Sequence, residues 1–248
     1  MKATILTSCF NCGPWLKPCI RSVMSQGYKD WEWIIVDDKS SDKSMSILKK
    51  YAKKCSKIKI MSNKKRLGCG GSYAFALEHA TGDVCCVVDA DDILSSKLSL
   101  GTIMSLYKKY PDVAYIWSQF EFCDPYMKFV KRGMCRVPKI SFLQSGLDYS
   151  KDRHSFSHWR TFRTELRGKG LIFNPDLPAA VDKWMGYTLE ELGVGGFINK
   201  VLYLYRQRVG GLSFKGRKHW KKMLKTFDAR RKKMKISPYP QIELEGVD

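Results

Sequence analysis

The sequence predicts an α/β fold, in which helices cover both faces of a mostly parallel central sheet within a single domain. Over the first hundred residues, short apolar strand patterns alternate with stretches of helical spacing. The strands are apolar at nearly every position, which is typical of a parallel sheet that is buried on both faces. With 248 residues, 44% of them hydrophobic, the chain is long enough to form one large core.

The elements of the first half follow one another in a regular strand–helix order. Ser40 or Ser41 is a suitable N-cap for the second helix, because a side-chain hydroxyl can accept a hydrogen bond from the first helical turn. The predicted strands are 3–9, 31–36, 58–62 and 83–88, and the predicted helices are 16–26, 41–55 and 71–80.

The second half of the chain is less regular. The polar and aromatic segment 150–163 is interpreted as a loop, or as the start of a helix, over a site. Residues 1–213 are expected to form the domain, with halves 1–100 and 101–213, before a basic C-terminal helix or tail at 214–248. The remaining predicted elements are helices 97–110 and 184–192 and strands 113–122, 129–132 and 197–205.

Polar side chains gather where the predicted strands of the first half end. In an open α/β sheet, ligands bind in the crevice beyond the carboxyl ends of the strands. A binding site is therefore expected at this edge of the sheet, lined by Ser8, Asp37, Asp38, Asn63, Asp89, Asp91 and Asp92.

The strongest local signal is a pair of carboxylates, Asp89 and Asp91, one residue apart at the end of an apolar strand. Carboxylate oxygens suit hard cations such as Mn²⁺ and Mg²⁺. A cation held there would neutralise the charge that builds on a leaving diphosphate. An acidic turn in which Asp92 caps the next helix is the structural alternative, but the position after an apolar strand favours the metal site.

A second pair of acids, Asp37 and Asp38, follows the strand at 31–36. We expect Asp38 to accept hydrogen bonds from a nucleobase or a ribose hydroxyl. After Lys39, the residues Ser40, Ser41 and Asp42 are expected to cap the following helix instead.

Taken in order, these pieces resemble the large family of glycosyltransferases with the GT-A fold, often called family 2, over roughly residues 3–100. Its members open with a strand that ends in a Ser/Thr–Tyr–Asn-like turn, here Ser8-Cys9-Phe10-Asn11. A later strand ends in Asp-Asp-x-Ser-x-Asp, here residues 37–42, and Ala80-Thr81-Gly82-Asp83 leads into the D-x-D pair. Together, in this order and spacing, these motifs are specific.

The resemblance implies an inverting glycosyltransferase whose donor is a nucleotide diphosphate sugar, with a UDP-sugar expected. It implies Mn²⁺ or Mg²⁺ as cofactor, held by Asp91 with Asp89, and a glycan or another hydroxyl-bearing molecule as acceptor. Residues 1–100 would bind the donor and residues 101–213 the acceptor. The residues expected at the nucleotide sugar are Ser8, Phe10, Asp38, Arg66, Asp89 and Ala90.

One segment departs from the family pattern. Many relatives carry an Ala-Arg-Asn triplet where this chain has Ser72-Tyr73-Ala74. An arginine is thus missing on that side of the donor site, and Arg66 or Lys65 is expected to take its place.

The acceptor half has an acid, Asp182, in a Val-Asp pair before a helix, where the family places its base. By this resemblance, Asp182 would remove the proton from the acceptor hydroxyl as that oxygen attacks the anomeric carbon. An N-cap for a helix that begins at Lys183 is the alternative. The expected anion or acceptor contacts are His158, Arg206 and Arg208.

The chain is strongly basic, with a formal net charge of +20, and so attracts anions of every kind. In segment 215–235, basic residues are mixed with apolar ones at helical spacing. This pattern fits a basic amphipathic helix on an anionic membrane, or a helix docked on the domain with its charges in solvent. His219 in this tail is a candidate further metal ligand. Nucleic acid is not expected as a partner, because no reader motif is present.

Two other functions fit part of these observations. A sugar-phosphate nucleotidyltransferase uses a similar sheet, but the glycine-rich loop that it needs after the first strand is missing. A non-catalytic module that binds nucleotides or other anions would need neither a metal nor Asp182. No apolar run is long enough to span a membrane, so we expect a cytoplasmic protein, either free or peripheral to a membrane.

Overall fold

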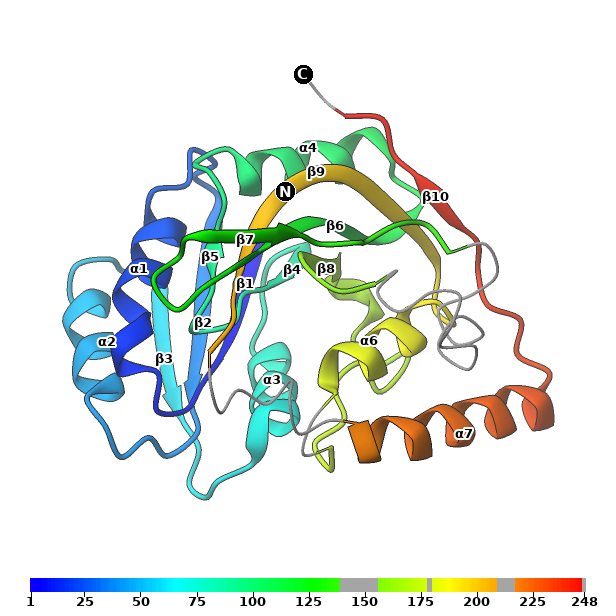
Figure 1. The fold of residues 1–248 in the computed structure, drawn as a ribbon, viewed down its shortest axis with the longest axis horizontal. Coiled ribbons are helices and arrows are strands. Elements are labelled where there is room, and N and C mark those ends of the chain that lie inside the picture. Colours follow the sequence, from blue (N-terminus) through cyan, green and yellow to red (C-terminus); the bar gives the residue numbers. More distant parts are fainter. Residues whose placement is uncertain (139–155, 178–179, 209–216, 247–248) are drawn as a thin grey trace.

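The computed structural model describes residues 1–138, 156–177, 180–208 and 217–246, with side chains from Met223 onward in the last range. Its strands form one sheet in the order β10-β9-β6-β8-β4-β1-β2-β3, in which β5 also pairs with β9 and β7 with β6 (Figure 1). Five of the nine strand pairings within these residues are parallel. The predicted α/β fold with a central sheet is confirmed.

The first half forms one parallel half of the sheet. β1 (Ala3–Cys9) lies between β2 (Trp31–Asp37) and β4 (Val84–Val87), and β3 (Ile58–Ser62) pairs with β2 at the edge. Every residue of β2 and β4 is buried, as expected for strands that are covered on both faces. The intervening helices are α1 (Gly13–Met24), α2 (Ser44–Ala52) and α3 (Gly68–Glu78).

The second half completes the sheet around two long strands, β6 and β9, of which β9 is strongly curved (Figure 1). β6 and β9 run parallel to each other, and β7 folds back along β6 as a hairpin. The helices α1 and α2 lie on one side of β1–β3, and α3 lies with α6 on the other (Figure 1). The elements are β5 (Ile93–Leu94), α4 (Ser99–Lys109), β6 (Val113–Cys123), β7 (Phe129–Arg132), α6 (Val181–Leu189), β9 (Val194–Arg206), α7 (Arg217–Met234) and β10 (Gln241–Glu243).

The interpretation of 150–163 as a loop or helix start is wrong for its last four residues. Arg160–Arg163 forms β8, which pairs antiparallel with both β4 and β6 and so joins the two halves of the sheet. Residues 150–155 of this segment lie outside the described ranges. β8 is followed by a short 3₁₀ turn, Thr164–Leu166.

The start of α2 differs from the predicted N-cap. The N-cap residue is Lys43, which makes no side-chain capping hydrogen bond. Ser40 instead accepts a hydrogen bond from the backbone N–H of Asn11, at 3.0 Å. Of the three expected capping residues, Asp42 alone reaches the helix, where its Oδ1 accepts from the backbone N–H of Ser44 at 2.9 Å.

The basic tail forms α7, whose apolar side packs on the domain. Phe227 is buried with its ring 4.7 Å from that of Trp184 and 5.4 Å from that of Tyr187, both on α6. Arg231, also buried, forms an ion pair with Glu191, the Nε–Oε1 distance being 2.6 Å. The docked-helix interpretation is thus the one that the structure adopts for this part of the tail. None of the described helices is both long enough and apolar enough to cross a membrane.

A buried acid, Glu32, links neighbouring segments at the amino-terminal ends of the parallel strands. Glu32 on β2 accepts hydrogen bonds from the hydroxyl of Thr4 at 2.8 Å and of Thr81 at 2.7 Å. Its second oxygen lies 2.7 Å from Lys59 Nζ. Burial opposes the charge on Glu32, but these partners lower its pKa from 4.5 to about 2.

Candidate active site

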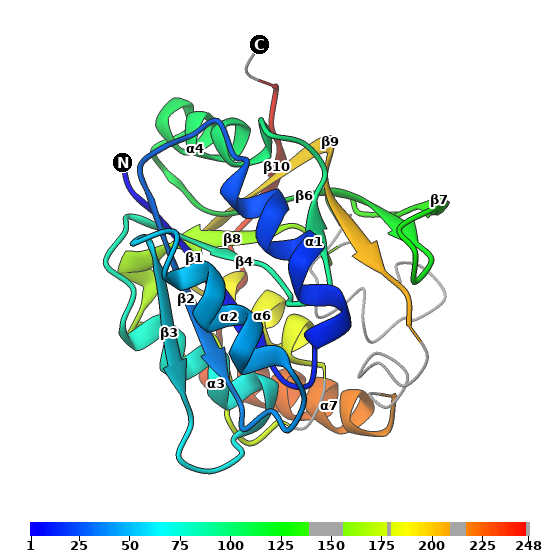
Figure 2. The ribbon, with the colours of Figure 1, turned by 90° about the vertical axis from the view of Figure 1, so that its left-hand side faces the viewer.

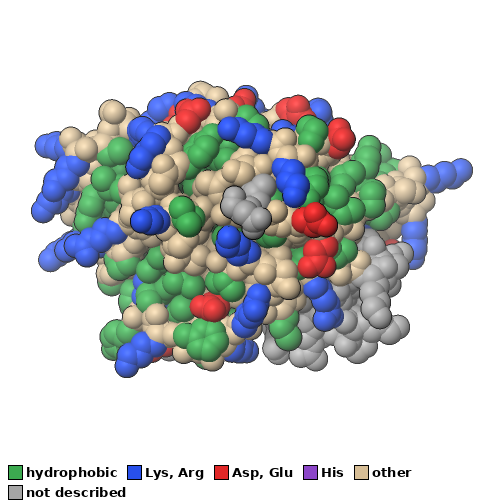
Figure 3. All heavy atoms as spheres, turned by 90° about the horizontal axis from the view of Figure 1, so that it is seen from above, with side chains coloured by type: hydrophobic (Ala, Val, Ile, Leu, Met, Phe, Trp, Pro, Cys, Tyr) green, Lys and Arg blue, Asp and Glu red, His purple; other side chains and the backbone are tan. Residues whose placement is uncertain are grey.

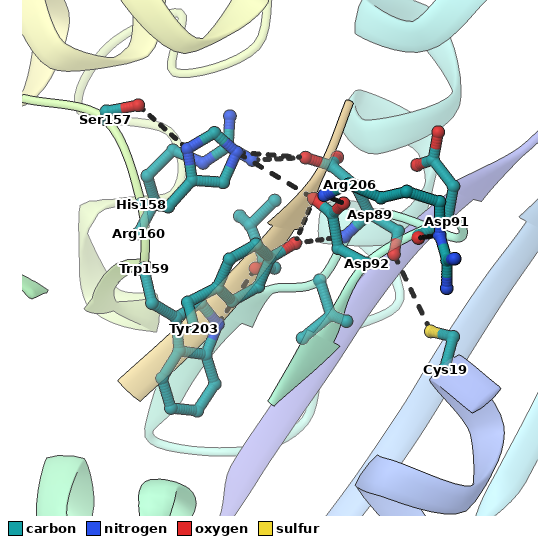
Figure 4. Close-up of polar contacts among 12 residues, drawn as sticks. Cys19, Asp89, Asp91, Asp92, Ser157, His158, Trp159, Arg160, Tyr203 and Arg206 are labelled. Carbon is teal, nitrogen blue, oxygen red and sulfur yellow. Dashed lines mark hydrogen bonds and ion pairs between the residues drawn. The ribbon is translucent and has the colours of Figure 1, made fainter. Parts of the chain in front are cut away.

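The predicted ligand residues converge at the carboxyl ends of β1, β2 and β4. Asp89, Asp91 and Asp92 follow β4 directly, while β8 and β9 bring a second set of side chains against them (Figure 4). The first half of the chain therefore supplies the acids of the site and the second half supplies most of their partners.

Asp89 is held in one orientation by groups from three elements. Its Oδ1 accepts a hydrogen bond from the hydroxyl of Tyr73 on α3 at 2.5 Å, and its Oδ2 lies 2.6 Å from Nη2 of Arg160 on β8. Its backbone N–H donates to the hydroxyl of Tyr203 on β9 at 3.0 Å. Burial opposes the charge on Asp89, but Arg160 and His158 hold its pKa below the ordinary value.

Asp92 ties the acidic loop to β9 instead of capping a helix. It is fully buried, and its Oδ2 accepts a hydrogen bond from the Tyr203 hydroxyl at 2.9 Å. Its Oδ1 accepts from the backbone N–H of Arg206 at 2.8 Å. Burial, helped by the charges of Asp91 and Asp89, raises the pKa of Asp92 well above its ordinary value, which favours the neutral acid.

Asp91 points away from these two acids and forms an ion pair with Arg208, which follows β9. Arg208 Nε lies 2.5 Å from Asp91 Oδ2. Burial opposes the charge on Arg208, but Asp91 raises the pKa of the guanidinium. The neighbouring Arg206 donates from Nε to the backbone carbonyl of Asp91 at 2.7 Å, and its guanidinium lies 4.9 Å from the ring centroid of Trp15.

His158 faces Asp89 and Asp92 with a nitrogen that lacks a partner. Its Nε2 lies 3.6 Å from Asp89 Oδ2 and 3.9 Å from Asp92 Oδ2, and within the described residues it has no hydrogen-bond partner. One ligand atom from each of the three side chains lies within 4.8 Å of the others. Burial, reinforced by Arg160, lowers the pKa of His158, so the neutral imidazole that can bind a metal is favoured.

The charged acids of this cluster already have cationic partners. Arg160 pairs with Asp89 and Arg208 with Asp91, Arg206 adds a further positive charge, and burial favours the neutral forms of the remaining acid and of the histidine. An added cation would be repelled unless one guanidinium moved away. The side chain of Arg208 is 28% exposed and that of Arg160 only 7%, so Arg208 is the one that can move more easily.

A second cluster lies at the ends of β1 and β2 and contains three of the predicted nucleotide contacts. The guanidinium of Arg66 stacks 3.6 Å from the ring centroid of Phe10, and its Nε lies 3.9 Å from Asp38 Oδ2. Asp38 is buried, and accepts hydrogen bonds from Asn63 Nδ2 and from the backbone N–H of Gly68, both at 2.8 Å. Asp38 thus also fixes the loop that carries Arg66.

The other predicted residues of the donor side have smaller roles in the structure. Ser8 is the last but one residue of β1 and lies beside the thiol of Cys69, and Ala90 is buried between two of the acids. Asp37, expected in the crevice, accepts a hydrogen bond from the backbone N–H of Ser40 at 3.1 Å and so forms part of a turn.

Asp182 is not the N-cap of its helix. α6 begins at Val181, and its N-cap residue is Ala180, with no side-chain capping hydrogen bond. Asp182 is half-buried, and its charge acts to raise the pKa of both His158 and Arg160. The carboxylate of Asp182 is thus within electrostatic range of both side chains.

Three residues of the cluster escaped the sequence analysis: Tyr73, Arg160 and Tyr203. Arg66 or Lys65 was expected to replace the missing family arginine. The guanidinium beside Asp89 belongs instead to Arg160 of β8. Tyr73 lies in the triplet that departs from the family pattern, which was the one signal for it in the sequence. The side chain of His219, the third predicted metal ligand, lies outside the described part of α7.

Comparison with known proteins gave concordant matches. A model of the family described as Glycosyl transferase family 2 matches residues 4–170. An uncharacterized glycosyltransferase of Haemophilus influenzae is 32% identical over 211 residues, which cover 82% of this chain and 64% of that protein.

Solved structures share the fold at low identity. S. aureus TarS 1–349 in complex with UDP-GlcNAc has a TM-score of 0.70 and 21% identity, and the match covers 86% of this chain and 60% of that one. Mannosyltransferase PcManGT from Pyrobaculum calidifontis, in complex with GDP-Man and Mn²⁺, has a TM-score of 0.65 and 19% identity, covering 86% and 59%. This chain thus spans about three fifths of the length of these proteins, whose fold is that of GT-A glycosyltransferases.

Proposed function

From the premise that this chain belongs to glycosyl transferase family 2 and is a glycosyltransferase, we propose that it transfers a sugar from a UDP-sugar to a hydroxyl acceptor, with inversion and with a divalent cation. The observation that supports this most is the acidic cluster at the end of β4. Its carboxylates are held in place by hydrogen bonds and ion pairs from residues of both halves of the chain. The family match favours a transferase over a nucleotidyltransferase or an anion-binding module.

The donor would bind across the ends of β1, β2 and β4. The Phe10–Arg66 pair offers a flat, cationic surface against which a base can stack, and Asp38 holds the loop that carries Arg66. Ser8 and Ala90 would contact the nucleotide sugar at the ends of β1 and β4. A UDP-sugar is proposed as the donor because it is common in this family, and TarS was crystallised with UDP-GlcNAc.

The chemistry of the donor set fits a hard divalent cation, because two partly exposed carboxylates leave the same strand. We assign Asp89 and Asp91 as its ligands, which requires the Asp91 side chain to turn from its partner Arg208 towards Asp89. When bound, the cation would neutralise the leaving diphosphate. Arg208 would leave Asp91 and turn its guanidinium to the donor phosphates, while Asp92 and His158 would support Asp89 from the buried side. His219 remains a proposed further ligand.

Asp182 would act as the general base. It would take the proton of the acceptor hydroxyl as that oxygen forms a bond to the anomeric carbon and the bond to the diphosphate breaks. With a single displacement and no covalent intermediate, the configuration at the anomeric carbon inverts. A glycan is the proposed acceptor.

The test is a donor screen that follows nucleoside diphosphate release from UDP-, GDP- and dTDP-sugars, with Mn²⁺ or with a chelator. We expect metal-dependent release from one UDP-sugar, which Asp91→Ala abolishes although the variant remains folded by circular dichroism. Asp182→Asn should lower turnover by about 10²- to 10⁴-fold and leave donor affinity unchanged. Near-normal turnover of Asp91→Ala would overturn its metal assignment. Loss of Mn²⁺ affinity in His158→Gln, but not in Asp91→Ala, would place the cation at Asp89, Asp92 and His158.

A further inference from the structure

The turn and strand after β6 expose an unusual concentration of apolar side chains. Tyr126, Phe129, Val130 and Met134 are all exposed within nine residues, and Tyr126 is 85% exposed. Of the six other exposed large hydrophobic side chains of the described residues, three also lie within nine residues, in the tail, and three are separate: Met234, Tyr239 and Ile242, and Met1, Leu98 and Leu171. Successive residues of a strand point to opposite faces, so Phe129 and Val130 place apolar groups on both faces of this projecting hairpin. Such a concentration of exposed apolar side chains is typical of an interaction site. We call residues 124–134 the hairpin surface.

Basic residues are interleaved with these apolar ones. Lys128, Lys131 and Arg132 are all exposed. Asp124, the acid of the hairpin surface, is engaged in the turn, where its Oδ1 accepts hydrogen bonds from the backbone N–H groups of Tyr126 and Lys128, both at 2.8 Å. Residues 124–134 hold three basic residues and one acid, and Glu121 of β6 stands opposite Arg132 in the strand register. The surface thus combines aromatic and aliphatic groups with a net positive charge, which suits the interface of a membrane that contains anionic lipids.

A second copy of the chain fits this surface less well. Within the described residues, β7 pairs with β6 alone, so its other edge is open to another strand. Parallel, in-register pairing of two copies of β7 would place Lys131 and Arg132 opposite the same residues of the other copy, and like charges opposed across strands are destabilising. The lipid headgroup carries the charge that the surface lacks.

The hairpin surface is joined to the candidate active site. The backbone N–H of Gln207 donates to the carbonyl of Cys123 at 2.8 Å, and Arg206 contacts the carbonyl of Pro125 with one nitrogen and that of Asp91 with another. β7 projects from the body of the molecule beside the end of β9 (Figure 2). A surface that rests on the hairpin would therefore lie close to the acidic cluster.

We propose that the hairpin surface docks the protein on an anionic lipid membrane, with the candidate active site held beside the lipid surface. Membrane binding is independent of the proposed sugar transfer. The proposed function enters at one point, where membrane binding would bring the active site to an acceptor that is itself held in the membrane. Among the described side chains of α7, Met223, Leu224 and Phe227 are buried, and Phe227 packs on α6. We therefore assign the apolar contact with the membrane to the hairpin.

The test is co-sedimentation of the full chain with vesicles of phosphatidylcholine that contain no phosphatidylglycerol or 30% of it. The variant Lys128→Gln/Phe129→Ser has a matched control, Lys97→Gln/Leu98→Ser. Each pair is a lysine followed by an apolar residue, and Phe129 and Leu98 are both 61% exposed. We expect the wild type and the control to bind the anionic vesicles, and the hairpin variant to bind at least about tenfold more weakly. Donor turnover without vesicles should be equal in all three proteins.

Three results would overturn the proposal. The first is no binding of the wild type to anionic vesicles, and the second is equal binding by the hairpin variant or equal weakening in the control. The third is self-association that rises with protein concentration in sedimentation velocity and is abolished in the hairpin variant, while this variant binds lipid as the wild type does. That result would assign the surface to a second copy of the chain. Turnover that is lost in every protein would instead count against the proposed function.

Discussion

At the residue scale, the candidate site contains carboxylates that already form ion pairs with arginines of the same chain. Asp89 is paired with Arg160 and Asp91 with Arg208, but the two arginines differ in accessibility. The buried pair fixes geometry, because moving Arg160 would leave a buried carboxylate without its partner. The more exposed pair is the one that can open, and we therefore expect Arg208 to set how tightly the cation proposed at Asp91 is held.

Removing this guanidinium should therefore strengthen metal binding while it weakens turnover. For Arg208→Gln we expect about tenfold higher affinity for Mn²⁺, because the cation no longer competes with a positive charge 2.5 Å from the Asp91 carboxylate. Turnover should fall, since the same side chain is proposed to reach the donor phosphates. Free Mn²⁺ measured by electron paramagnetic resonance tests the affinity without relying on activity.

The matched control is Lys200→Gln, which removes one positive charge from an exposed position of the same β9. Its Mn²⁺ affinity should change little, because that charge is exposed and screened. Unchanged or weaker affinity in Arg208→Gln would mean that Arg208 does not compete with the cation.

Glu32 offers a second prediction at this scale, on stability and its dependence on pH. Its pKa falls from 4.5 to about 2 on folding, so the folded state favours the charged form. The stabilisation is complete above pH 4.5 and is lost as the pH falls towards 2. Glu32→Gln should lower the free energy of unfolding at pH 7 by about 1–3 kcal/mol, and the difference from wild type should shrink between pH 4.5 and 2.

Urea unfolding curves at several pH values measure this difference. Glu78→Gln, at an exposed position of α3, is the control and should match the wild type throughout. A difference between Glu32→Gln and wild type that stays constant down to pH 2 would contradict the assigned role of the Glu32 charge.

At the scale of elements, α7 and α6 form a unit whose packing supports the proposed base. α6 carries Asp182 in its first turn, and the same helix presents Trp184 and Tyr187 to Phe227 of α7. The ion pair between Arg231 and Glu191 adds a polar tie between α7 and the end of α6. A helix that looks like an appendage in the sequence is thus part of the domain's packing.

Phe227→Ala should lower the free energy of unfolding by about 3–5 kcal/mol, because it deletes a buried ring and leaves a cavity. Met234→Ala, at an exposed position of the same helix, should change it by less than about 0.5 kcal/mol. Denaturant titration followed by tryptophan fluorescence measures both. Equal, small effects would mean that α7 contributes little to the stability of the domain.

The sequence predicts some elements well and others not at all, for physical reasons. Runs of buried apolar residues mark β1, β2 and β4, because both faces of each strand are covered. β5 and β10, of two and three residues, are too short to show any periodicity. β8 holds two arginines in four residues, a composition that favours a loop in a sequence analysis. It is nevertheless a central strand, because Arg160 is buried in an ion pair with Asp89.

The same distinction holds for the candidate site. The carboxylates of Asp89 and Asp91 could be predicted, because an apolar strand places both at its carboxyl end. Tyr73, Arg160 and Tyr203 could not, since they come from three elements that only the order of strands in the sheet brings together. The metal and base roles of Asp91 and Asp182 stay predictions, which the variants above test.

At the scale of the whole molecule, the positive charge surrounds a site that is itself close to neutral. The chain has 44 basic and 24 acidic residues, and Lys and Arg side chains are spread over the face seen in Figure 3 rather than gathered in one patch. Such a field acts on any anion that approaches, including the diphosphate of the proposed donor.

This field predicts a salt dependence that metal should reduce. Without metal, the affinity for UDP should fall about tenfold between 0.05 and 0.5 M NaCl, because salt screens the attraction between the diphosphate and the protein. With saturating Mn²⁺ the fall should be smaller, since the cation neutralises the diphosphate before it meets the field. Calorimetric titration measures both, and equal salt dependence in the two series would contradict this explanation.

The position of β8 has a consequence for how the protein is made. β4 pairs with β1 on one side and with β8 on the other, so its second edge has no strand beside it until residues 160–163 have been synthesised. The growing chain must therefore keep an apolar sheet edge open while the whole segment between β4 and β8 leaves the ribosome. A fragment that stops after α4 would expose that edge permanently and should aggregate. The two halves, proposed to bind donor and acceptor, should for this reason form one folding unit, so that replacing one half alone should expose the edge of β4.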